Sequence, residues 1–226
     1  MERNVKTVHL ESALDAVDLY SLKVVPGMPL AQRLAKEGNW SEEERLARHA
    51  EGSDYLAAAG WKQLSTTHWG RNSLERNMYN TYAKIGVDMV PFGCGAGGFA
   101  GDWAIMQEGD LEKYIAKVDA GEKPIGMMVK TPPQRRTAQR FTRMMDLGYF
   151  DPAEIPETDF SPLFGNWTEA GVWTPRPEGG YRLTRLGEYY QTKLNSLLTG
   201  YHFAAHASMS DMLKMGIGKL AEKMKG

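Results

Sequence analysis

The alternation of apolar and polar residues predicts short strands separated by longer helical segments in the first half of the chain. Residues 17–25, 61–65 and 87–92 are β-rich or apolar runs, so each is expected to form a strand. Between the first two, Ser41 begins a predicted helix, and Glu44 has the spacing of its capping-box partner. Strands that alternate with helices are typical of βα units in a parallel sheet. With only three such units, we expect part of a barrel rather than a closed one.

A different pattern follows residue 108. Periodicity and end signals predict helices over residues 110–120, 134–147, 159–171 and 184–198, with a hairpin between 172 and 184. The order helix, helix, hairpin, helix is typical of a winged-helix-like module. We therefore predict an α/β chain in two parts, a partial barrel over residues 1–108 and a helical, winged-helix-like domain over residues 109–226.

Composition and charge place the chain among ordinary soluble proteins. Its apolar fraction is 42%, its charged fraction is 24%, and its formal net charge is −1. A near-neutral chain is not expected to bind nucleic acids or anionic membranes in general. No apolar run approaches the roughly 20 residues that span a bilayer, and residues 1–6 do not resemble a secretory signal. A single cysteine, Cys94, excludes an internal disulfide framework and favours a cytoplasmic location.

Five short strings, taken in order, resemble one family. They are VDLYSLKVVPGMPL at 17–30, GWKQLS at 60–65, RNMYN at 76–80, FGCGAGG at 92–98 and YRLTRLG at 181–187. Together they resemble the relatives of oxygen-independent coproporphyrinogen III oxidase, which are radical S-adenosylmethionine (SAM) enzymes. THWGR at 67–71 and the glycines of 95–98 most resemble the haem-utilisation branch of that family. The resemblance implies an intact enzyme that methylates haem, opens its ring and releases iron.

The resemblance also implies a [4Fe–4S] cluster for which this chain lacks ligands. Such enzymes hold the cluster on a CxxxCxxC triplet, whereas Cys94 is the single cysteine here. We therefore expect the C-terminal half of such an enzyme, with the cluster supplied by a missing N-terminal half. A partial parallel sheet would also leave an edge to be covered. Both points predict a partner, either a separate cluster-bearing chain or a second copy.

The glycine-rich loop that follows the third predicted strand is the first candidate site. Consecutive backbone N–H groups without bulky side chains allow a ligand to approach closely, and the resemblance places this loop beside the SAM or substrate pocket. It also places one lysine late in the first strand, where relatives face SAM. The residues assigned to cofactor binding are Lys23, Gly93, Cys94, Gly95, Ala96 and Gly97. The alternatives are a structural turn for the loop, a small buried cysteine, and a lysine with its charge in water.

His68, Trp69 and Arg71 form the most distinctive group. A histidine can ligate haem iron or relay a proton, a tryptophan can stack on a macrocycle, and an arginine can pair with a propionate. Because all three are expected just past a strand end, we assign them to substrate binding, with His68 also catalytic. Asp102 as a proton donor and Trp103 as a stacking wall extend the site. The competing interpretation has His68 capping a loop, Trp69 in the core and Asp102 solvated.

The remaining candidates lie in the second part. His202 and His206 are spaced i, i+4 and suit a metal or haem axial pair, although two surface histidines are the simpler interpretation. The arginines of residues 130–143 could meet haem propionates or DNA phosphate, or form a solvated helix face. A final amphipathic helix is predicted over 204–223, with its methionines as a packing stripe.

Three hypotheses about function remain open. The first is the substrate and SAM pocket half of a haem-utilisation radical SAM enzyme, which is not catalytic alone. The second is a stand-alone haem-binding or haem-carrier protein. The third, a DNA-binding regulator built on the winged helix, is weakened by the near-neutral charge. The cofactors that the resemblance implies are SAM and haem, and no site for the Fe–S cluster is predicted in this chain.

Overall fold

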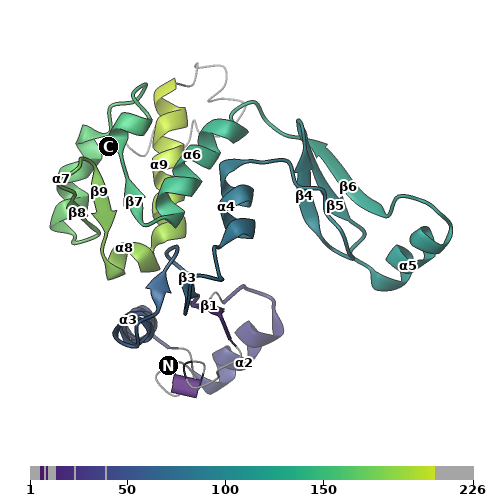
Figure 1. Cartoon of the computed structure of the whole chain (residues 1–226), viewed down its shortest axis with the longest axis horizontal. Helices are drawn as coiled ribbons and strands as arrows, with labels where there is room; N and C mark the ends of the chain where they lie inside the picture. The colour runs from purple at the N-terminus through teal and green to yellow at the C-terminus, as the bar shows by residue number, and fades with distance from the viewer. Residues whose placement is uncertain (1–5, 8, 10–13, 23, 39, 207–226) are drawn as a thin grey trace. The chain divides into compact units, whose positions relative to one another are not determined.

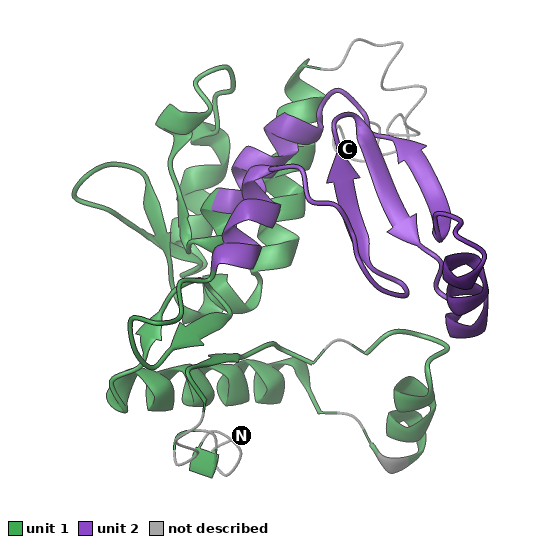
Figure 2. Ribbon diagram, turned by 45° about the vertical axis from the view of Figure 1, so that its right-hand side comes forward, with its two compact units in different colours: residues 1–77, 144–226 green, residues 78–143 purple. Residues whose placement is uncertain are grey.

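The computed structural model describes residues 6–7, 9, 14–22, 24–38 and 40–206. The chain divides into two compact units (Figure 2). Unit 1 combines residues 1–77 with 144–226, and unit 2 consists of residues 78–143. The boundary predicted at residue 108 lies inside unit 2, so a division into domains at that point stays a prediction. Among the described residues, no helix has both the length and the apolar character needed to cross a membrane.

The first sheet of unit 1 is antiparallel throughout. Its strands are β1 (Ala16–Asp18), β2 (Lys62–Gln63) and β3 (His68–Gly70), in the order β1-β3-β2 (Figure 1). The predicted parallel pairing is therefore wrong. The residues between β2 and β3 are far fewer than the dozen or so that a parallel crossover needs, so the two strands form a hairpin. β1 and β2 run in the same direction, but β3 lies between them.

Helices α2 (Pro29–Glu37) and α3 (Glu42–Ala58) lie between β1 and β2 in sequence. The predicted capping box of α3 is confirmed. The backbone N–H of Glu44 donates to Ser41 Oγ at 3.1 Å, and the Ser41 N–H donates to Glu44 Oε2 at 2.7 Å. With its first turn satisfied in this way, α3 buries Leu56 against the sheet, in one cluster with Trp61 and Trp69.

The second sheet of unit 1 carries the C-terminal helices. Its strands are β7 (Tyr149–Phe150), β8 (Trp173–Pro175) and β9 (Tyr181–Leu183), in the antiparallel order β7-β9-β8. The helical elements around it are η1 (Pro152–Glu154), α7 (Ser161–Glu169), α8 (Arg185–Tyr189) and α9 (Gln191–His206). Thr184 caps α8 as predicted, because its Oγ1 accepts from the Gly187 N–H at 3.2 Å.

Aromatic rings hold this second sheet to its helices. The planes of Phe150 and Trp173 are stacked with centroids 6.0 Å apart, and Phe164 lies edge-on to Trp173 at 5.6 Å. The predicted hairpin is present, and the helix predicted over 184–198 is divided into α8 and α9 at Tyr190. Whether this part is a winged-helix module stays a prediction, and the helix predicted over 204–223 lies outside the described residues after position 206.

Unit 2 contains a third antiparallel sheet that the sequence analysis did not predict. After α4 (Met78–Ile85) come β4 (Gly97–Ala100) and β5 (Trp103–Gln107), then α5 (Leu111–Asp119) and β6 (Ile125–Lys130). The strand order is β4-β5-β6. Helix α6 (Arg135–Asp146) follows and continues past the end of the unit.

The predicted strand over residues 87–92 is reduced to one bridge, between Met89 and Phe99. Pro91 explains part of this result, because proline has no N–H to donate to a ladder. The residues after the glycines, expected to prolong a loop, instead form the β4–β5 hairpin.

Candidate functional site

His68 is the centre of a small polar cluster in unit 1. It is 8% exposed and lies in β3 itself, not just past a strand end as predicted. Its Nδ1 lies 2.8 Å from Asp18 Oδ1, and its Nε2 lies 3.4 Å from Glu75 Oε1 without a hydrogen bond. Because a carboxylate only accepts, Asp18 fixes the proton on Nδ1. A hydrogen bond from the Asn77 N–H, with a smaller contribution from the His68 charge, lowers the pKa of Glu75, and burial opposes the shift.

The neighbours of His68 are occupied by protein contacts. Trp69 is 1% exposed and belongs to the core cluster with Trp61 and Leu56. The Arg71 guanidinium lies 4.8 Å from the centre of the Trp61 ring and donates to the backbone carbonyl of His9. The core packs the Trp69 ring but leaves its Nε1 without a hydrogen-bond partner among the described residues. The assignment of Trp69 to a macrocycle and of Arg71 to a propionate stays a prediction.

Backbone conformation and backbone hydrogen bonds explain several residues of the glycine-rich loop in unit 2. Gly93 and Gly95 have φ values of 100° and 71°, which residues with a Cβ rarely adopt. The Gly95 N–H donates to the Glu108 carbonyl at 2.8 Å, and the Ala96 N–H donates to the Gly93 carbonyl at 3.1 Å. Two of the backbone donors expected to face SAM therefore already donate to backbone carbonyls of the protein, one within the loop and one just after β5. SAM binding by this loop stays a prediction.

Gly98 is held by the closest backbone approach in this region. A Cβ at this position would lie 2.1 Å from the Met89 carbonyl oxygen and 2.8 Å from Pro91 Cδ. At Gly97 the nearest atom to such a Cβ is Met106 Cγ, at 4.0 Å. Gly93 and Gly95 thus fit a turn, and Gly98 fits the close approach of β4 to the backbone at Met89.

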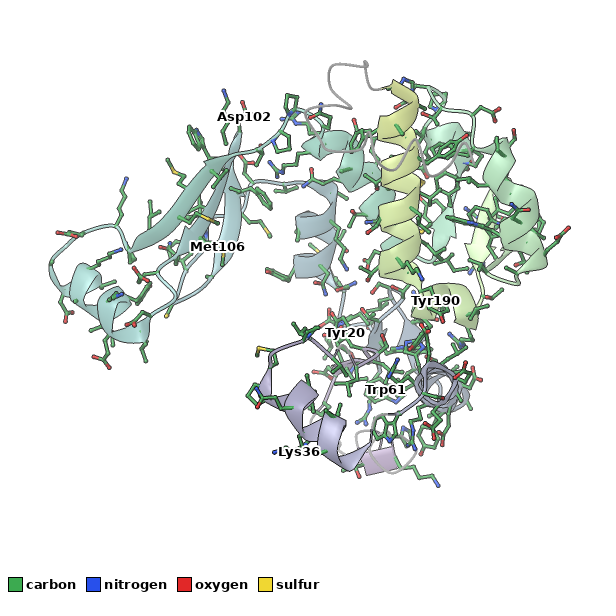
Figure 3. All side chains as sticks on the ribbon, turned by 180° about the vertical axis from the view of Figure 1, so that it is seen from behind. Tyr20, Lys36, Trp61, Asp102, Met106 and Tyr190 are labelled. Atoms are coloured by element: carbon green, nitrogen blue, oxygen red, sulfur yellow. The ribbon has the colours of Figure 1, made fainter. Side chains whose placement is uncertain are left out.

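Asp102 and Trp103 lie at the tip of the β4–β5 hairpin. Figure 3 labels Asp102 there and Met106 farther along β5. The Asp102 backbone carbonyl accepts from the N–H and the Oγ1–H of Thr131 at 2.7 and 3.0 Å. The Trp103 side chain is 42% exposed, and Lys130 of β6 lies opposite it in the ladder. The tip is therefore bound through backbone atoms and leaves both predicted side chains at the surface.

The other predicted site residues are distributed between the two units. Lys23 lies outside the described residues, and Cys94 is a half-buried free thiol. His202 is 6% exposed, so the surface interpretation is wrong for this residue. Thr158 Oγ1 lies 2.7 Å from His202 Nδ1 and 2.8 Å from His206 Nε2. The two histidines thus share one hydroxyl group.

The described residues offer no metal centre. Within the described ranges, no group of three or more His, Cys, Asp or Glu side chains is placed to hold a metal ion. The whole sequence contains one cysteine, so it cannot supply the three thiolates of a CxxxCxxC cluster. The residues of this chain therefore do not fit the [4Fe–4S] group.

Sequence reasoning missed a charged network in unit 1. Arg185 donates to Asp54 Oδ1 at 3.1 Å, to Gln63 Oε1 at 3.2 Å and to Glu188 Oε2 at 2.7 Å. Beside it, burial and then the Arg185 charge lower the pKa of His49, which a hydrogen bond to the Leu19 backbone opposes. Asp54 and Gln63 are 131 and 122 positions from Arg185, so no local spacing signals the network.

The fold is similar to part of a solved enzyme structure. The chain matches the solved structure of coproporphyrinogen III oxidase from Escherichia coli, described as a radical SAM enzyme, with a TM-score of 0.63 and 16% identity. The match covers 88% of this chain and 51% of that one. At this identity the likeness defines the fold alone.

Sequence comparison adds a particular relative. The chain is 31% identical over 190 residues to anaerobilin synthase of Escherichia coli O157:H7. The match covers 80% of this chain and 42% of the relative, so the chain spans less than half of that protein's length. No family model matches the sequence. The two matches confirm the resemblance to coproporphyrinogen oxidase-like radical SAM proteins that the five strings indicated.

Proposed function

We propose that this chain is the substrate and SAM pocket part of a haem-utilisation radical SAM enzyme. The observation that carries the proposal is the 31% identity over 190 residues to anaerobilin synthase. The likeness to coproporphyrinogen III oxidase supports the fold that the proposal requires. In the intact enzyme that the proposal describes, a separate part would hold the [4Fe–4S] cluster, which together with SAM would supply radical chemistry.

Each unit has its own candidate groups for this function. His68, with Asp18 on Nδ1 and Glu75 near Nε2, can hold or relay a proton at the macrocycle. Ligation of haem iron through Nε2 is the less favourable use, because the Glu75 carboxylate already lies 3.4 Å from that atom. Asp102 and Trp103 offer an exposed carboxylate and an exposed ring. The winged-helix-like second part and a cytoplasmic location complete the proposal.

Anaerobic titration of the chain with haem, followed by absorbance, tests the proposal. We expect one haem to bind, and we expect haem to be consumed when SAM and the cluster-bearing part of the E. coli relative are added together. Omission of that part should leave haem intact. Haem binding without any turnover in the complete mixture would favour the haem-carrier alternative. Absence of haem binding would overturn both.

A further inference from the structure

A cavity in unit 2 lies where the β4–β5 hairpin meets the start of α6. Its volume is about 520 Å³. The residues that line it are Asp102, Lys130, Thr131, Pro132, Pro133, Arg135 and Arg136. All of them belong to unit 2, so the cavity is complete within one compact unit. It contains the predicted residue Asp102 and the first part of the basic run.

The charges of this cavity are not balanced by the protein. Its lining has three cationic side chains, Lys130, Arg135 and Arg136, and one carboxylate. Within the part of the chain that the structure describes, none of the three cations forms an ion pair. Lys117, elsewhere in the same unit, pairs with Glu108 Oε2 at 3.0 Å. The cavity thus keeps an excess of positive charge that an anion can neutralise.

Arg135 forms a fixed wall of the cavity. Its Nη1 donates to the Gly101 carbonyl at 3.2 Å, its Nη2 donates to the Gly86 carbonyl at 3.4 Å, and its guanidinium lies 3.8 Å from the centre of the Phe99 ring. Its Nε is buried without a hydrogen-bond partner among the described residues. Because two backbone carbonyls and an aromatic ring hold the Arg135 guanidinium, its positive charge is fixed in position. The two exposed cations, Lys130 and Arg136, are left to contact a ligand.

An apolar surface continues from the cations along the sheet. Trp103 and Lys130 are opposite each other in the β5–β6 ladder, so their side chains share one face. The next pair on that face is Ile105 with Met128, and Met128 is 50% exposed. A flat apolar body could therefore lie on Trp103 and Met128 while a negative group attached to it reaches Lys130 and Arg136.

We propose that this cavity binds the carboxylate of a planar, apolar ligand, with Lys130 and Arg136 as the anion contacts and Trp103 beneath the planar body. Its assignment to a propionate of a tetrapyrrole rests on the proposed function. The preference for a carboxylate rests on the cavity itself. Arg135 is a positioning residue, because its guanidinium orders the hairpin tip and the start of α6.

The test compares acids with their esters. The probes are haem and haem dimethyl ester, together with 1-pyrenebutyrate and its methyl ester, which are planar but not tetrapyrroles. The cavity variant is K130Q/R136Q, and the matched control is K113Q/K123Q, which removes two exposed lysines elsewhere in unit 2. We expect each acid to bind about tenfold more tightly than its ester, which corresponds to the loss of a charge-assisted contact. The cavity variant should remove that difference, and the control should retain it.

The outcomes separate this inference from the proposed function. Haem that binds equally as acid and ester, with no effect of K130Q/R136Q, would overturn the cavity site and leave the proposed function standing. Pyrenebutyrate that binds through Lys130 and Arg136, with no haem binding, would support the cavity site and overturn the proposed function. Equal weakening by the cavity variant and its control would also overturn the site. Circular dichroism of both variants verifies that they are folded.

Discussion

The His68 cluster in unit 1 and the Asp102 cavity in unit 2 contain similar residue types in opposite environments. In the first, the tryptophan is 1% exposed and the histidine has carboxylates near both ring nitrogens. In the second, the tryptophan is 42% exposed and three cations have no ion pair among the described residues. In the first group, His68 Nδ1 contacts Asp18, while His68 Nε2 and Trp69 Nε1 are buried without a hydrogen-bond partner among the described residues. In the second group, Lys130 and Arg136 are exposed and have no ion pair among the described residues.

The two regions differ in what the contacts of their side chains indicate about ligand binding. Buried polar groups are normally hydrogen-bonded for stability alone, so satisfied partners do not indicate a ligand. Cations that line a cavity without an ion pair raise the local positive potential, which favours an anionic ligand. Sequence reasoning favoured the His68 group because its residues are distinctive, whereas the structure favours the cavity because its charges lack partners.

Separate replacement of Trp69 and Trp103 by alanine should give the largest difference in stability between the two regions. Trp69→Ala empties a fully buried core position and should lower the free energy of unfolding by about 3 to 5 kcal/mol. Trp103→Ala should change it by no more than about 1 kcal/mol, because much of that ring is already in water. Urea denaturation followed by circular dichroism measures both. Equal losses would show that the Trp103 ring is also a core residue.

Gly97 and Gly98 provide a matched pair of substitutions within unit 2. Gly98→Ala forces a Cβ against the Met89 carbonyl and should cost about 1 to 3 kcal/mol through a displaced strand crossing. Gly97→Ala has room for its Cβ and serves as the control. Hydrogen exchange of peptides that contain Met89 and Phe99 reports whether the bridge between these two residues is intact. Unchanged protection in Gly98→Ala would contradict the close approach.

The same substitution at two aspartates gives a smaller difference. Asp18→Asn weakens the charge-assisted hydrogen bond to His68 and should cost about 1 kcal/mol, since the carboxylate is partly exposed. Asp102→Asn should leave the free energy of unfolding within about 0.5 kcal/mol and should strengthen binding of an anion in the cavity. Denaturation and the pyrenebutyrate titration measure the two effects. A stability loss at Asp102 that matched the one at Asp18 would remove the distinction between the regions.

The smallest effect concerns pH. Burial lowers the pKa of His49 below its ordinary value of 6.5, so the folded chain favours the neutral ring. The unfolded chain takes up the proton first, and the free energy of unfolding therefore falls as pH drops below 6.5 and through the lowered pKa. His49→Gln should flatten this part of the pH profile. Denaturation midpoints between pH 7 and pH 5 measure it, and identical slopes would contradict the assignment.

Local signals predicted the helices well. Ser41 and Thr184 cap the helices that the sequence predicts after them, and the helix predicted from residue 110 is capped by Asp110, because capping depends on residues three positions apart. Pairing of strands was predicted poorly. The antiparallel β3 and the β4–β5–β6 sheet depend on partners elsewhere in the chain, and alternation does not specify a partner. Burial of Trp69 and the unpaired charges around Asp102 likewise follow from tertiary contacts that spacing does not encode.

Strand β6 ends the third sheet in the part of the chain that the structure describes, with Met127, Met128 and Val129 each about half exposed. A strand of this kind is a template for adding another strand, and apolar side chains on both faces make the addition favourable. The β6 edge is therefore where we expect aggregation of this chain to begin. Chaperone supply and expression rate would then decide its yield as much as its folding free energy does.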